Sequence, residues 1–315
     1  MVPPVPRRRP LTRVVVTGAG GYLGGRLVRH LHDIGTDVRA LSRHPAPWLP
    51  VPAVVGEMND DVLDGALDGA SAVVHLAGSD EVAAAADPEG TTAATTSAAR
   101  AIVNATRRAE RVRLVYVSTV HVYGAAITDG AVLTEDTAPA PTAPYAAARL
   151  QCEAICRDAN DTVVLRLTNG VGAPIDAAVD RWTLVANDLC RQAVTTGRVE
   201  LRTHGLQWRD FIALTDVVDA IARATDAEQL ASGTYNLGSG RSRTVRELAG
   251  IVQDGAETLT GTRPALAAPP PPTAEPAPYA VSIDRLAAQG WKPEGSLPAA
   301  VEETLAFCLA HRSEL

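Results

Sequence analysis

Short apolar runs alternate with helix-like segments over the first half of the chain. Segment 13–17 reads RVVVT and segment 162–167 reads TVVLRL, without regular alternation of polar and apolar residues. A short continuous apolar run bounded by turn residues predicts a strand buried on both faces. The same reading predicts strands at 37–41, 53–56, 72–76 and 113–117, with helical composition at 91–109. Strands that alternate with helices predict an α/β fold with a doubly wound parallel sheet.

Beyond residue 174 the pattern changes and helices predominate. Helices are predicted at 182–194, 216–225, 244–252 and 297–308, and short strands at 199–202, 207–213 and 234–237. A proline-rich connector at 267–278 cannot be helical, because proline lacks the N–H donor that a helix interior needs. We therefore expect a smaller C-terminal α/β region beside the parallel sheet.

The change of pattern predicts two domains. Residues 12–172 are expected to form the first, with 212–238 returning to it, and residues 173–211 with 239–315 the second. Residues 1–11 are rich in proline and arginine and are expected to form a disordered tail. No apolar segment follows their basic residues, so they do not resemble a secretory signal.

A glycine-rich turn, GAGGYLG at 18–24, joins the first strand to a helix marked by Leu27, Leu31 and Ile34. Glycines in this position let backbone N–H groups approach a pyrophosphate at a helix N-terminus. The turn therefore predicts a dinucleotide site. The alternative is a tight turn without a ligand.

The end of the second strand favours NADP over NAD. An acidic residue there would bind the adenosine ribose 2′-hydroxyl of NAD, but the chain has Ser42 and Arg43 instead. A hydroxyl and a guanidinium suit a 2′-phosphate. The alternative is that Arg43 is a solvated loop charge.

Two later strands carry polar side chains of different character. His75 lies inside an apolar run, which favours a structural histidine over a catalytic one. Ser118 and Thr119 follow the run at 113–117. Their hydroxyls are therefore expected at the carboxyl edge of the sheet, where open α/β sheets bind ligands.

The segment PYAAAR at 144–149 places a tyrosine and a cation four residues apart. Alanine is the strongest helix former, and proline suits a helix start. Four-residue spacing puts Tyr145 and Arg149 on one helix face, where a permanent positive charge favours the phenolate of a general acid/base. The alternative is a surface helix with an exposed pair. If charge alone matters, Arg149→Lys keeps or raises activity.

Composition excludes several function classes. The 315 residues carry a net charge of −7, which gives no general attraction to nucleic acid or to an anionic membrane surface. No apolar run approaches the roughly 20 residues that span a bilayer. Four cysteines without close pairing and the absence of a metal-ligand cluster favour a cytoplasmic protein with reduced thiols and no metal.

With these motifs in order, the chain resembles the extended short-chain dehydrogenase/reductases, the NAD(P)-dependent epimerase/dehydratase group that acts mostly on nucleotide sugars. Segment 17–24 matches its T-G-x-x-G-x-x-G turn, and segment 118–124 its catalytic Ser/Thr stretch. Segment 145–149 takes the place of Y-x-x-x-K, with Arg149 instead of lysine. Segments 74–77, 166–174, 209–211 and 235–240 also match.

The resemblance implies a Rossmann-type fold, NADP or NAD as cofactor, a nucleotide-sugar substrate and a homodimer. It assigns catalysis to Tyr145, Thr119 and Arg149. It assigns cofactor contacts to Gly18, Gly21, Tyr22, Leu23, Gly24, Ser42, Arg43, Glu57, Met58, Leu76, Ala77, Gly78, Tyr145 and Arg149. Substrate contacts fall on Ser118, His121, Asn169, Asn187 and Arg209.

The resemblance implies a reductase of a keto-sugar first, and a 4-epimerase that retains NAD as the alternative. Dehydratases of the group carry acids after the catalytic threonine, where this chain has Val120 and His121, which argues against a 4,6-dehydratase. The phosphate-binding motif near the C-terminus of many sugar epimerases is not visible, so a reductase of a non-nucleotide metabolite stays open. The replacement at Arg149 also leaves open a non-catalytic dinucleotide-binding protein.

Overall fold

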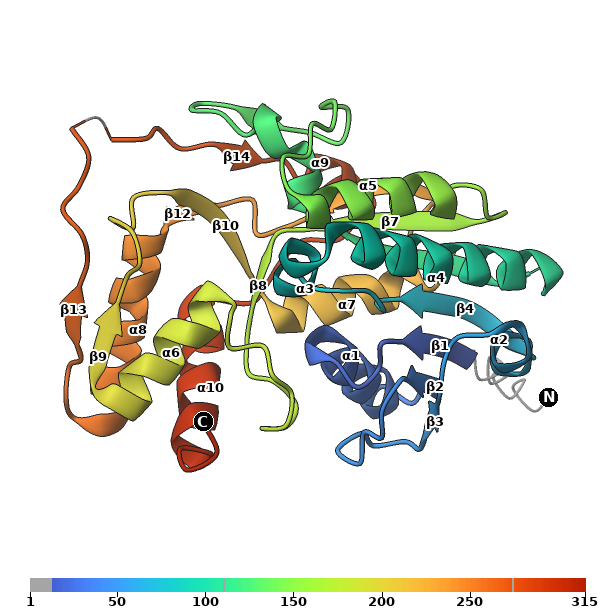
Figure 1. The fold of residues 1–315 in the computed structure, drawn as a ribbon, viewed down its shortest axis with the longest axis horizontal. Coiled ribbons are helices and arrows are strands. Elements are labelled where there is room, and N and C mark those ends of the chain that lie inside the picture. The colour runs from blue at the N-terminus through green and yellow to red at the C-terminus, as the bar shows by residue number, and fades with distance from the viewer. Residues whose placement is uncertain (1–12, 110, 274) are drawn as a thin grey trace, which may run out of the picture.

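Seven parallel strands form the central sheet, in the order β11-β7-β5-β4-β1-β2-β3 (Figure 1). This computed structural model describes residues 13–109, 111–273 and 275–315, so the expected tail lies outside the described residues. The strands are β1 (Arg13–Thr17), β2 (Asp37–Ser42), β3 (Ala53–Val55), β4 (Ala70–His75), β5 (Arg113–Thr119), β7 (Thr162–Leu167) and β11 (Gly233–Leu237). The expected doubly wound α/β fold is confirmed.

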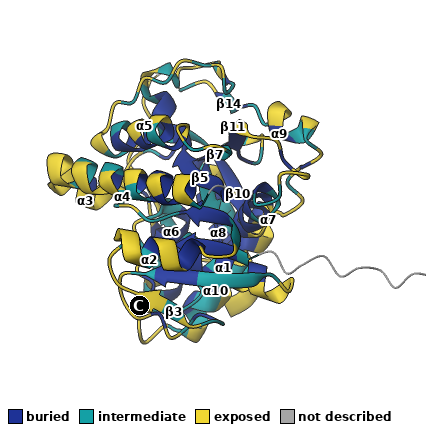
Figure 2. Ribbon diagram, turned by 90° about the vertical axis from the view of Figure 1, so that its right-hand side faces the viewer, coloured by how far each residue is buried: buried dark blue, intermediate teal, exposed yellow. Residues whose placement is uncertain are grey.

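Helices cover both faces of this sheet. They are α1 (Tyr22–Asp33), α2 (Asp60–Leu67), α3 (Glu81–Ala86), α4 (Pro88–Arg108), α5 (Pro144–Cys156) and α7 (Leu214–Ala224). Successive side chains of a strand point to opposite faces. Val14 and Val16 accordingly pack with α1 and α7, and Val15 packs with α2, α4 and α5. Burial on both faces explains why the strands are continuously apolar, and Figure 2 shows them buried beneath helices with exposed outer sides.

A smaller region lies beside the sheet, at the left of Figure 1. Its three-stranded sheet has the order β12-β10-β8. Helices α6, α8 and α10 pack together on it around a separate apolar core. Their bounds are β8 (Asn169–Val171), β10 (Trp208–Ala213), β12 (Ser242–Thr244), α6 (Val185–Thr196), α8 (Val245–Thr260) and α10 (Leu297–Ala310).

Short elements complete the chain. Strand β9 (Arg198–Glu200) pairs with β13 (Ala265–Ala267), and β6 (Val132–Leu133) pairs with β14 (Ala280–Val281). A 3₁₀ segment, η1 (Val120–Ala126), follows β5, and α9 is Asp284–Ala288. No helix in the described ranges is both long and apolar enough to cross a membrane.

The strand order reverses between β1 and β4, and this reversal positions the site. Open α/β sheets bind ligands in the crevice outside the carboxyl ends of the strands at such a point. The turns after β1 and β4 touch there, because a Cβ on Gly18 would lie 2.9 Å from the backbone nitrogen of Ala77. Gly18 also has a φ of +67°, which favours glycine.

Several boundaries differ from the sequence expectations. The short helices α2 and α3 were not expected, since each is too short to show a clear period. Helix α6 begins at Val185 rather than at residue 182, and α8 continues to Thr260. The helix marked by Leu27, Leu31 and Ile34 is α1, which ends at Asp33, with Ile34 as its exposed C-cap.

His75 occupies a structural position. Its side chain is fully buried, and its Nδ1 lies 2.9 Å from the Thr17 hydroxyl oxygen. Burial, and then the charge of Arg149, lower the pKa of His75 to about 3 from an ordinary value of 6.5. Between pH 6.5 and about 3, the native protein therefore holds a neutral imidazole, whereas the unfolded chain binds a proton there.

We predict that His75 makes the protein less stable as the pH falls from 6.5 toward 3. Each bound proton changes the free energy of unfolding by about 1.4 kcal/mol per pH unit, so roughly 2 kcal/mol is lost between pH 6.5 and about 5. Chemical denaturation of His75→Gln at several pH values should show a shallower slope by this amount. His44→Gln, at an exposed imidazole, should keep the original slope. An unchanged slope in His75→Gln would contradict this account.

Candidate active site

One cleft of about 970 Å³ runs along the carboxyl edge of the large sheet. Among the expected site residues, it is lined by Gly18, Gly21, Tyr22, Leu23, Gly24, Ser42, Arg43, Glu57, Met58, Leu76, Ala77, Gly78, Ser118, Thr119, His121, Tyr145, Arg149 and Asn169. Asn187 and Arg209 do not line it. Residues that the sequence analysis singled out on separate strand ends and helices therefore share one surface.

The glycine turn has the form of an anion cradle. The N-cap of α1, Gly21, makes no side-chain hydrogen bond to the helix, and the first turn of α1 contains no acidic residue. The helix therefore presents unsatisfied N–H groups and the positive end of its dipole. A Cβ on Gly24 would lie 2.1 Å from the carbonyl oxygen of Gly18, so the turn closes only with glycine there. These features fit the pyrophosphate of a dinucleotide.

We call the end of the cleft beside β2 the adenosine end, after the contact that the sequence predicts there; it carries cationic and hydroxyl groups. Ser42 ends β2, and the exposed Arg43 and His44 follow it. A Cβ on Gly20 would lie 2.8 Å from the Ser42 Oγ, so the glycine turn packs directly against this strand end. Gly20 was not among the expected site residues, although it lies within the motif that predicted them.

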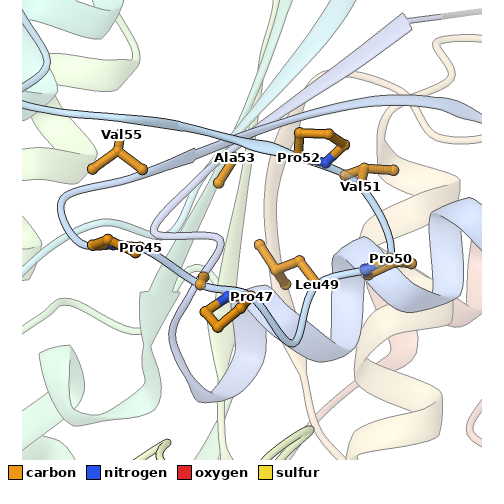
Figure 3. A pocket seen from close by; sticks show the side chains of 9 residues that line it. Pro45, Pro47, Leu49, Pro50, Val51, Pro52, Ala53 and Val55 are labelled. Carbon is orange, nitrogen blue, oxygen red and sulfur yellow. The ribbon is translucent and has the colours of Figure 1, made fainter.

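A separate apolar hollow of about 450 Å³ lies in the loop between β2 and β3 (Figure 3). Pro45, Pro47, Leu49, Pro50 and Val51 surround it. The side chains that line it bring no ionisable or hydrogen-bonding group, so it offers no chemistry. Pro45 lines both the hollow and the main cleft, and the hollow thus marks a proline-stiffened loop at the adenosine end.

Tyr145 and Arg149 lie in the first two turns of α5. Pro144 begins the helix. Tyr145 is partly exposed and lines the cleft, while Arg149 is only 8% exposed. The guanidinium carbon of Arg149 lies 5.2 Å from the centroid of the Tyr145 ring. Thr119 ends β5 on the same cleft, and its Oγ1 accepts a hydrogen bond from the His121 N–H. A phenol, a hydroxyl and a cation thus face one space.

A buried cluster of charged and polar residues anchors α5 to β5 and β7. Glu153, one turn beyond Arg149, is fully buried and accepts hydrogen bonds from Arg166 at 2.8 Å and from the Ser118 hydroxyl at 2.7 Å. Arg157 adds an exposed partner at 2.9 Å. The Ser118 hydroxyl therefore donates its proton to the interior rather than to the cleft.

His121 offers a neutral imidazole to the cleft. Burial, and then the positive charge of Arg209, lower its pKa below the usual value of 6.5. Its ring can therefore accept a proton or a hydrogen bond at neutral pH. Asn169 lies across the cleft, and its amide nitrogen donates to the backbone oxygen of Asp210 at 2.8 Å.

Neither the buried Asn187 nor the half-buried Arg209 is part of the cleft lining. Asn187 is 1% exposed; its side-chain oxygen accepts from the Tyr22 hydroxyl at 3.2 Å, and its nitrogen donates to the Arg181 backbone oxygen. Arg209 donates to the backbone oxygen of Trp208. In this structure Asn187 therefore holds the wall together, while Arg209 acts on the cleft through its charge.

Residues 173–184, here called the strap, connect β8 to α6; part of the strap lines the cleft, and its Ile175 packs against α1 at Gly25. Arg181 of the strap pairs with Asp80 at 3.1 Å and with Glu81 at 3.3 Å, beyond β4. Directly before the strap, the Tyr22 hydroxyl donates to the Gly172 carbonyl. Sequence reasoning missed Arg181, because the strap has no periodicity and its partners are about a hundred residues away.

Comparison with known proteins agrees with this geometry. Residues 14–238 match the NAD dependent epimerase/dehydratase family. A UDP-glucose 4-epimerase of Azospirillum brasilense is 30% identical over 90% of this chain and 87% of its own. A GDP-6-deoxy-D-mannose reductase of Pseudomonas aeruginosa is 28% identical over 78% of this chain and 80% of its own. The solved structure of MoeE5 in complex with UDP-glucose and NAD is 26% identical, with a TM-score of 0.77 and coverage of 96% of this chain and 99% of that one.

We predict that Glu153→Ala destabilises the protein by about 3–5 kcal/mol, because Arg166 would remain buried without its carboxylate. Chemical denaturation measures the free energy of unfolding. The matched control is Arg157→Ala, which removes the partly exposed partner of the same carboxylate and should cost no more than about 1 kcal/mol. Equal losses in the two variants would show that burial of the Glu153–Arg166 pair does not determine its contribution to the free energy of unfolding.

Proposed function

The chain belongs to the NAD dependent epimerase/dehydratase family, and we propose that within it the protein transfers hydride between a nicotinamide and a nucleotide-activated sugar. Its first proposed reaction is the reduction of a keto-sugar by NADPH. The observation that carries the proposal is the meeting of Tyr145, Thr119 and the Arg149 charge in the cleft that also contains the glycine turn. The nucleotide-sugar class is supported by the two relatives and by MoeE5.

In this proposal Tyr145 exchanges a proton with the substrate oxygen whose carbon is oxidised or reduced. Thr119 donates a hydrogen bond to that oxygen and stabilises charge that develops on it. The guanidinium carbon of Arg149 lies 5.2 Å from the centroid of the Tyr145 ring, so its permanent charge would stabilise negative charge that develops there in the transition state. The nicotinamide, when bound, supplies or accepts the hydride.

The glycine turn and the open N-terminus of α1 would hold the pyrophosphate, and Tyr22, Leu23, Glu57, Met58 and the 76–78 turn would border the cofactor. On the substrate side, we propose that the neutral His121 and Asn169 contact the sugar. Arg209 would attract the substrate diphosphate through its charge, from outside the cleft lining. Its influence on His121 supports a position within electrostatic reach of the cleft.

The preference for NADPH rests on the adenosine end. The end of β2 supplies Ser42 and Arg43 rather than a carboxylate, so it can bind a 2′-phosphate and cannot pair with a 2′-hydroxyl in the usual acidic way. A planar guanidinium binds phosphate through paired hydrogen bonds. NADPH also suits a net reduction, because reduced cofactor is consumed.

We predict that Arg43→Ala weakens NADPH binding about tenfold or more while leaving NADH binding nearly unchanged, since a hydrogen bond to a charged group contributes roughly 1.5–3 kcal/mol. Fluorescence titration of the reduced cofactors measures both affinities. Arg29→Ala, which removes an exposed arginine from α1 outside the cleft, controls for net charge. A parallel loss for both cofactors in Arg43→Ala would refute a role in reading the 2′-phosphate.

A 4-epimerase that retains its cofactor is the second candidate function. The 30% identical relative is a UDP-glucose 4-epimerase. In addition, the ion pairs of Arg181 with Asp80 and Glu81 attach the strap to the segment that follows β4. A fastened strap favours a cofactor that stays bound between turnovers. Incubation with NADPH and a panel of nucleotide-linked keto-sugars separates the two functions. Consumption of NADPH in step with product supports the reductase, and interconversion of nucleotide sugars without added cofactor supports the epimerase.

We predict that Tyr145→Phe lowers kcat by about a hundredfold to ten-thousandfold, the usual contribution of a positioned proton donor. Dinucleotide affinity should change little, because only the hydroxyl is lost. Steady-state kinetics and cofactor titration on the same preparation provide the two readouts. Full activity in Tyr145→Phe would remove Tyr145 from the chemistry. Dinucleotide binding without activity in the unaltered chain would instead favour a binding protein.

A further inference from the structure

Arg149 is a buried cation to which no described residue offers a carboxylate partner. It is 8% exposed, and none of the ion pairs in the described part of the chain includes it. Burying a charge without a counter-charge is costly, so its position must be maintained by other contacts. Those contacts come from the turn after β4, from β5 and from Tyr145.

We call the contacts with Gly78, Ser79 and Tyr116 the guanidinium socket. One Nη of Arg149 donates to the Tyr116 hydroxyl at 3.5 Å, and the other donates to the Ser79 backbone oxygen at 3.4 Å. Both bonds are long, so neither alone would fix the side chain. Tyr116 is fully buried in β5 and therefore cannot move aside.

Gly78 supplies the third side of the socket. A Cβ at this position would lie 3.0 Å from each Nη and 3.1 Å from the guanidinium carbon of Arg149. These separations are shorter than ordinary van der Waals contact. A side chain at position 78 would therefore crowd the guanidinium, which would have to shift by a few tenths of an ångström. The guanidinium carbon also lies 5.2 Å from the centroid of the Tyr145 ring, so such a shift would move the charge relative to the phenol.

A lysine would not use this socket in the same way. The guanidinium is planar, and its two terminal nitrogens reach two acceptors while its body fills the space above Gly78. An ammonium is a compact point charge on a flexible chain, and it cannot fill the same plane. These contacts therefore predict that Arg149→Lys lowers activity, contrary to the expectation that charge alone makes arginine and lysine equivalent.

We propose that Gly78 is a positioning residue: its missing side chain admits the Arg149 guanidinium, and the Tyr116 hydroxyl and Ser79 carbonyl orient it beside Tyr145. The inference rests on the proposed roles of Tyr145 and Arg149 in proton transfer. Residues 78 and 149 then form a matched pair, in which glycine at position 78 leaves room for arginine at position 149. A residue with a Cβ at position 78 belongs with the slimmer lysine.

A double-mutant cycle tests the pair with Gly78→Ala, Arg149→Lys and the double variant. In the otherwise unaltered chain, Gly78→Ala should lower kcat at least about tenfold, equivalent to 1.4 kcal/mol of transition-state stabilisation. The KM for the sugar substrate should change less than kcat, because the displaced charge acts on the proton-transfer step rather than on sugar binding. Arg149→Lys alone should lower kcat to a similar extent. When Gly78→Ala is added to Arg149→Lys, it should cause no further loss.

Gly233→Ala controls for backbone conformation. Gly233 has a φ of +152° and Gly78 a φ of +159°, so alanine is disfavoured similarly at both. The nearest atom to a Cβ on Gly233 is 3.5 Å away, which is ordinary contact, and Gly233 lies outside the cleft. Gly233→Ala should therefore change thermal stability equally in the unaltered chain and in the Arg149→Lys variant.

The same cycle is followed by thermal unfolding, which requires no substrate. Gly78→Ala should lower the melting temperature more in the unaltered chain than in the Arg149→Lys variant. An effect of Gly78→Ala that is the same in both backgrounds, in kcat and in melting temperature, overturns the socket. If the unaltered chain transfers no hydride while this stability coupling persists, the proposed function fails and the socket stands.

Discussion

A permanent positive charge buried at the carboxyl edge of the sheet is the constraint on which the site depends. Arg149 has no carboxylate partner within the described ranges, and burial opposes its charge. It stays in place because α5 is fixed from both sides. One turn later, Glu153 is bonded to Arg166 and to Ser118 of β5. On the other side, the turn after β4 passes within contact distance of the guanidinium at Gly78. The proposed proton transfer by Tyr145 depends on this placement of the charge.

The remainder of the cleft is arranged around this point. The glycine turn after β1 presents the unsatisfied N-terminus of α1, and the turns after β1 and β4 are in direct backbone contact. Tyr22 extends the cofactor turn into the smaller region through Gly172 and Asn187. The strap joins the two regions again through Arg181. The two regions are therefore linked at two points, which suits the proposed reaction, in which a dinucleotide and a sugar must be held in register.

Local patterns predicted the parts of this structure that depend on local physics. The strands are buried on both faces and so are continuously apolar, and the glycine turn carries its own steric requirement, as Gly24 against Gly18 illustrates. The four-residue spacing of Tyr145 and Arg149 likewise survives as a contact. Long-range relations were not visible. The Arg181 ion pairs, the burial of Asn187 and the contact between Gly78 and Arg149 join residues that are distant in the chain. An interpretation that considers only the charge at position 149 therefore treats arginine and lysine as interchangeable.

Chemical rescue tests the central claim most directly, namely that the charge beside Tyr145 acts through a guanidinium-shaped space. Arg149→Ala should leave a cavity bordered by Gly78, Ser79 and Tyr116, with low hydride-transfer activity on the substrate that the unaltered chain accepts. Millimolar guanidinium, a concentration far below denaturing levels, should restore a measurable fraction of kcat, whereas an alkylammonium of similar size should not. Equal rescue by both cations, or by neither when the variant is folded and binds the dinucleotide, would contradict the account.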